Sequence, residues 1–64
     1  MSATNSYVSV IHELNIKAWD NRYIDRTKAM ELALQAKENA EKYNNLVDFH
    51  FAQLTIAQLN FWKS

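Results

Sequence analysis

Cysteine, glycine and proline are all absent from this 64-residue chain. Without cysteine there are no disulfides and no thiolate metal sites. Without glycine and proline there are no glycine-rich phosphate loops, no type I′ hairpins of the usual composition and no proline-rich linkers. What remains favours helices that are joined by short polar turns.

Excess charge of either sign is also missing, because seven basic residues balance seven acidic ones. A neutral chain lacks the electrostatic footprint that nucleic acid or anionic lipid requires. No run approaches the roughly 18 uninterrupted apolar residues of a membrane span. The N-terminal residues 1–6 lack the basic and apolar regions of a signal peptide. We therefore expect a cytoplasmic protein that binds neither nucleic acid nor membrane.

The periodicity predicts an all-α chain of three helices. The first covers residues 6–21, with Asn5 or Ser6 as its N-cap, and the second covers residues 26–43 with Asp25 as its N-cap. The second helix should end at Asn44-Asn45, since asparagine tolerates the left-handed conformation. Four alanines fall on one line of the second helix and would let a neighbouring helix approach closely: Ala29, Ala33, Ala36 and Ala40.

The third predicted helix, residues 46–62, is apolar almost all round. Its only Asp, Glu, Lys or Arg side chain is Asp48, and its polar strips, Asp48-Thr55 and Gln53-Asn60, are narrow. A helix of this kind is normally buried, yet two other helices of similar size cannot surround it. Either the third helices of two copies pack together, or the chain is a fragment whose next helix is missing.

This helix has two apolar sides, and either could be the face that contacts a partner. Phe49, Ala52, Ile56 and Leu59 lie on one side, and nearly opposite lie Val47, Phe51, Leu54 and Phe61. A second copy would be met through the first set or through Phe51, Phe61 and Trp62. One side should pack on the alanine line of the second helix and the other should meet a partner. The sequence does not decide between them, so the predicted interface includes both sets: Phe49, Phe51, Ala52, Ile56, Leu59, Phe61 and Trp62.

The second helix resembles the second helix of a tetratricopeptide-type repeat. That helix carries two alanines seven residues apart, as Ala29 and Ala36 are here, and Ile16 and His50 lie one 34-residue period apart. The chain is similar in style to degenerate repeats at the N-termini of bacterial signalling proteins, including diguanylate cyclases. This resemblance implies a helical hairpin plus one helix in an up-down-up array, and a regulatory or dimerising role.

Residues 1–64 are expected to form a single domain, since a chain this short has room for one. We expect residues 1–5 to be flexible and the chain to be the N-terminal fragment of a longer protein. Below about 70–80 residues a single core rarely supplies more than about 3–5 kcal/mol. A partner subunit would add stability, so we expect a homodimer. The alternative is an adaptor whose groove binds a peptide or helix of a different protein.

Candidate catalytic groups are few. His12 and Glu13 are adjacent and point in different directions on a helix, and a metal site that joins His12 to His50 would need further ligands. The carboxylates outside the third helix fit solvated faces and caps, and no serine has an elbow motif or a partner base. We expect no enzyme activity, no metal and no cofactor, with a very small enzyme or metal protein as the remaining alternative.

Overall fold

The computed structural model describes residues 3–61, and it describes side chains from Val8 to Phe61. Over this range the chain forms three α-helices and no strand: α1 Ala3–Asp20, α2 Arg26–Lys42 and α3 Leu46–Phe61. The predicted all-α class and the three predicted helices are confirmed.

The first helix begins earlier than predicted. α1 starts at Ala3, so Asn5 and Ser6 lie inside it and the prediction that one of them is its N-cap is wrong. Neither glycine nor proline is present to stop the helix, which continues for a further turn toward the N-terminus. It therefore includes residues 3–5 of the segment that was expected to be flexible.

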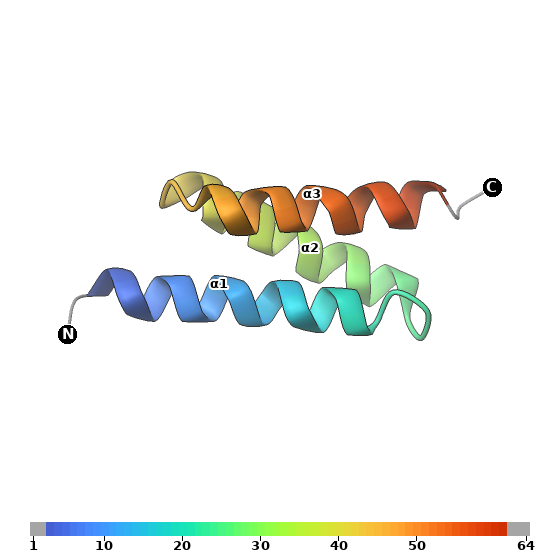
Figure 1. Cartoon of the computed structure of the whole chain (residues 1–64). Helices are drawn as coiled ribbons and strands as arrows, with labels where there is room; N and C mark the ends of the chain where they lie inside the picture. Colours follow the sequence, from blue (N-terminus) through green and yellow to red (C-terminus); the bar gives the residue numbers. More distant parts are fainter. Residues whose placement is uncertain (1–2, 62–64) are drawn as a thin grey trace.

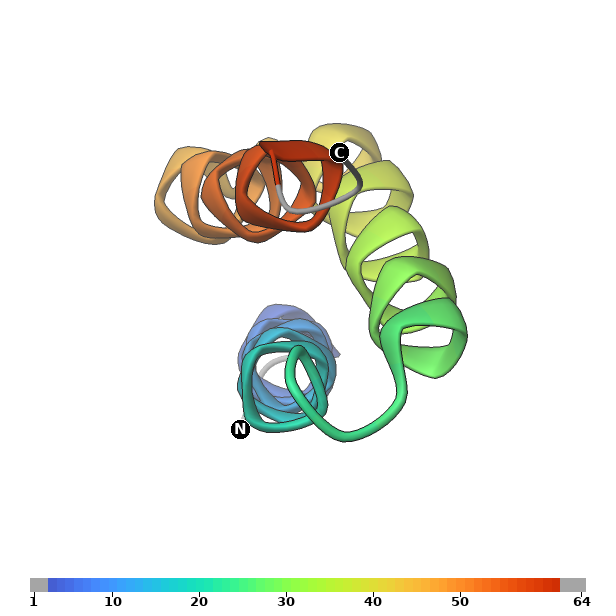
Figure 2. The same cartoon turned by 90° about the vertical axis from the view of Figure 1, so that its right-hand side faces the viewer.

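The three helices lie side by side with α2 in contact with both others. In Figure 1, α1 and α3 run in the same general direction and α2 returns between them, and the end-on view of Figure 2 places α2 to one side. α2 packs against α1 and against α3 far more extensively than α1 and α3 pack against each other. One side of the α1–α3 pair is therefore left without a covering helix. Within the described range, no helix combines the length and the hydropathy needed to cross a bilayer.

Both ends of α2 follow the sequence prediction. Asp25 has an extended backbone, and its side chain accepts a hydrogen bond from the Lys28 backbone N–H at 3.0 Å, which confirms it as the N-cap. At the other end Asn44 has a φ of 58°, in the left-handed region that asparagine tolerates better than most residues. The short polar turn that follows carries the chain from α2 into α3.

The alanine line of α2 forms the centre of the molecule. Ala29, Ala33, Ala36 and Ala40 are all buried. Ala36 and Ala40 share a cluster with Ile11 of α1. Ala52 of α3 completes this cluster, so all three helices meet where the side chains are small. The prediction that this line faces close neighbours is confirmed.

The structure also settles which side of α3 faces inward. The buried residues of α3 are Asp48, Ala52, Thr55 and Leu59. Two of them, Ala52 and Leu59, belong to the first of the two apolar sides identified in the sequence. The other two form one of the narrow polar strips, which therefore points into the protein and not into solvent.

Candidate interaction surface

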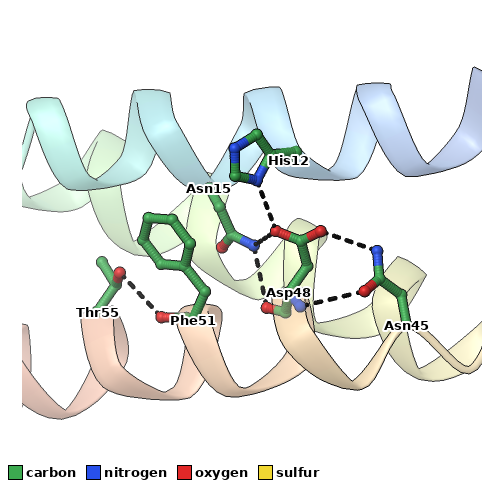
Figure 3. Close-up of polar contacts among 6 residues, drawn as sticks. All are labelled: His12, Asn15, Asn45, Asp48, Phe51 and Thr55. Atoms are coloured by element: carbon green, nitrogen blue, oxygen red, sulfur yellow. Dashed lines mark hydrogen bonds and ion pairs between the residues drawn. The ribbon is translucent and has the colours of Figure 1, made fainter.

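A buried polar cluster fixes α3 against α1. Asp48 of α3 lies at its centre, and its Oδ1 accepts from His12 Nδ1 at 3.0 Å and from Asn15 Nδ2 at 3.1 Å (Figure 3). Asn15 Nδ2 also reaches the Asp48 backbone carbonyl at 3.0 Å. Asn45, just before α3, donates to Asp48 Oδ2 at 2.8 Å and accepts from the Asp48 backbone N–H at 3.2 Å. One carboxylate thus connects α1, the preceding turn and α3.

These hydrogen bonds keep the Asp48 carboxylate ionised. Burial alone would raise the pKa of Asp48, because a charged group is costly to desolvate. The hydrogen bonds from His12, Asn15 and Asn45, together with the attraction of His12, outweigh this effect and hold the pKa below its ordinary value. Since the carboxylate only accepts, His12 Nδ1 is the donor of the pair.

The buried part of the molecule also contains two uncharged polar side chains. Asn15 and Thr55 are both fully buried, and the Thr55 hydroxyl donates to the Phe51 carbonyl one turn earlier at 3.2 Å. The Asn15 Oδ1 is buried without a hydrogen-bond partner. Because a buried polar group is costly unless it is paired, the cluster favours one rotation of α3 about its axis over the others. The side of α3 that faces outward follows from this rotation.

The outward side of α3 is apolar. Val47, Leu54 and Phe61 are seven residues apart, close to two helical turns, and their exposed fractions are 77%, 57% and 78%. We call these three residues the α3 outer strip. None of the positions between them that share this side is charged: His50, Phe51, Ala57 and Gln58. An exposed apolar row of this kind marks a surface for another protein more often than a surface for water.

A shallow groove lies beside the α3 outer strip. It has a volume of about 420 Å³ and is lined by Trp19, Val47, His50, Phe51 and Leu54. Phe51 forms its wall between the helices, because its ring meets the edges of Trp19 and His12 with centroids 6.4 Å and 6.2 Å apart. The groove therefore joins the exposed side of α3 to the C-terminal part of α1.

An arginine stacks on Trp19, one of the residues that line this groove. The Arg22 guanidinium is 3.7 Å from the centre of the Trp19 ring and 4.5 Å from that of Tyr23. Its Nη1 donates to the Trp19 carbonyl at 2.6 Å, while its Nε is buried and has no hydrogen-bond partner. Stacking on two rings holds the guanidinium in place.

The predicted interface residues differ in burial. Ala52 and Leu59 are buried in the protein's own core, and Phe49, Phe51 and Ile56 are partly buried. Phe61 is exposed, while Trp62 lies outside the described residues. Sequence reasoning did not place Val47 and Leu54 in the predicted interface, although they share one side of the helix with Phe61.

Sequence reasoning also missed the Asp48 cluster. His12 and Asp48 are 36 positions apart and Asn15 and Asp48 are 33 apart, so no local spacing connects them. The available signal was the lone carboxylate in an otherwise apolar helix, since such a group must either reach solvent or find donors inside the protein.

We looked in the Asp48 cluster for a nucleophile paired with His12 and for a group of metal ligands. The second ring nitrogen of His12 points away from Asp48 (Figure 3), and no serine or threonine of residues 8–61 is hydrogen-bonded to it. An oriented histidine without a nucleophile lacks the first element of covalent catalysis. In the described part of the chain, no three His, Asp or Glu side chains are grouped so that they could hold a metal ion.

Comparison with protein-family models, with curated proteins and with solved structures finds no match to this chain. The function is therefore inferred from the surface of the protein itself.

Proposed function

We propose that this chain is a non-catalytic protein-interaction and dimerisation module. The observation that carries the proposal is the α3 outer strip, in which Val47, Leu54 and Phe61 expose more than half of their side chains to solvent. The strip continues along the full length of α3, and no charge interrupts it. A partner that covers it would remove these three apolar side chains from water.

The size of the core supports the same proposal. Six of the eight buried apolar side chains in the described region are alanines, and the other two are Ile11 and Leu59. Alanine contributes little apolar area, so the folded chain gains little from burial. A domain of this size usually needs an additional source of stability, and it has no cysteine for a disulfide. A second chain on the α3 outer strip would supply it.

The finer architecture is part of the proposal. We infer an up-down-up array that corresponds to a helical hairpin plus one helix of a tetratricopeptide-like repeat. Ala29 and Ala36, on which the resemblance depends, are both buried against neighbouring helices, as the close packing of such a hairpin requires. A regulatory role at the N-terminus of a cytoplasmic bacterial signalling protein follows from that resemblance.

The groove beside Trp19 favours a second candidate function, an adaptor that binds a helix or peptide of another protein. Its lining is apolar apart from His50, and Arg22 stacks on Trp19, one of the lining residues. An apolar helix that carries a carboxylate near one end would fit this combination. Here the partner would be a different protein and the isolated chain would be a monomer.

A charge placed on the α3 outer strip tests the proposal. Leu54→Glu should abolish association, because a carboxylate would be desolvated inside the interface. Gln53→Glu is the matched control, since it adds the same charge at the neighbouring exposed position on another side of α3. By sedimentation velocity at micromolar concentration, the unaltered chain and the control should have about twice the 7.5 kDa chain mass, and Leu54→Glu the mass of one chain.

The helical content of each variant is measured in parallel by far-ultraviolet circular dichroism. A dimer that survives Leu54→Glu would show that the α3 outer strip is not the interface. A chain that is monomeric without any substitution would overturn the dimerisation proposal and leave the adaptor function.

A further inference from the structure

We draw no further inference here: the strongest candidate, the exposed apolar side of α3 together with the groove beside Trp19, is an unpartnered face, and nothing in the structure shows what covers it.

Discussion

The two faces of α3 differ from those of an ordinary amphipathic helix, because the inward face buries polar side chains together with apolar ones and the outward face exposes large apolar ones. The inward face carries a carboxylate and a hydroxyl, and Asp48 and Thr55 are 3% and 0% exposed. The outward face carries Val47 and Phe61, which are exposed by more than three quarters. An ordinary surface helix would turn its apolar residues inward and its polar residues outward.

The polar pairs of Asp48 therefore act together with the burial of Ala52 and Leu59 in determining the orientation of α3. Asp48 finds three side-chain donors inside the molecule, from His12, Asn15 and Asn45. Rotating α3 so that Phe61 faced inward would strand these donors and the carboxylate. Contacts within the chain therefore fix the orientation of α3, and its large exposed apolar side chains are left for contact with a partner.

The largest change in stability is expected when one leucine is truncated on each face of α3. Leu59→Ala should destabilise the fold by about 3 kcal/mol, because Leu59 is 2% exposed and its loss leaves a cavity. Leu54→Ala removes the same atoms from the exposed face of the same helix and should cost less than about 0.5 kcal/mol in the isolated chain. Urea denaturation followed by circular dichroism measures both changes.

Repeating the two measurements at several protein concentrations shows whether Leu54 lies in a dimer interface. If Leu54 lies in a dimer interface, the cost of Leu54→Ala should increase with protein concentration, since dimerisation then stabilises the folded state. The difference between the costs of Leu54→Ala and Leu59→Ala should be largest in dilute solution. Equal costs for the two variants in dilute solution would show that the two faces are equally buried, contrary to the structure.

A somewhat smaller effect is expected from removing the polar centre of the inward face. Asp48→Ala should cost about 2 kcal/mol, because the buried Asn15 side chain keeps only its hydrogen bond to the backbone carbonyl of residue 48, while His12 and Asn45 lose their acceptor. Glu31→Ala, an exposed acid on α2, is the control and should change stability by less than about 0.5 kcal/mol. If the two variants have the same denaturation midpoint, the cluster does not orient α3.

The sequence was sufficient for the features that depend on local spacing. The helix boundaries near Asp25 and Asn44, and the buried alanine line of α2, follow from capping chemistry and from the 3.6-residue period. These features depend on residues within a few positions of one another. The start of α1 was misplaced because capping residues such as Asn5 can also lie within a helix.

The rotation of α3 could not be predicted, because it depends on pairs that are distant in the sequence. Two apolar sides of similar size made the helix ambiguous, and the decision came from His12 and Asn15, on a different helix. One clue was present in the residues themselves. Asp48 is the single carboxylate of α3 and lies in its first turn. A carboxylate in this place can either cap the helix or accept hydrogen bonds inside the protein, and here it is buried.

The smallest expected effect is a dependence of stability on acid pH that arises from Asp48. Its pKa is lower in the folded chain than the ordinary value of 3.8, so the unfolded chain takes up the proton first as the pH falls. The stabilisation is therefore fully present above pH 3.8 and is lost as the pH falls through the lowered folded value. His12 is the titratable side chain that faces Asp48; Asn15 and Asn45 do not titrate.

Asp48→Asn isolates this contribution, because it keeps the size of the side chain and cannot ionise. Denaturation midpoints of both proteins, measured from about pH 5 down to about pH 2, should converge as the Asp48 carboxylate is protonated. The loss should be smaller than for Asp48→Ala, since a protonated carboxyl still fills its site and still accepts hydrogen bonds. Parallel curves over the whole range would mean that the carboxylate gains nothing from its donors in the folded chain, and the inward face of α3 would then be held by packing alone.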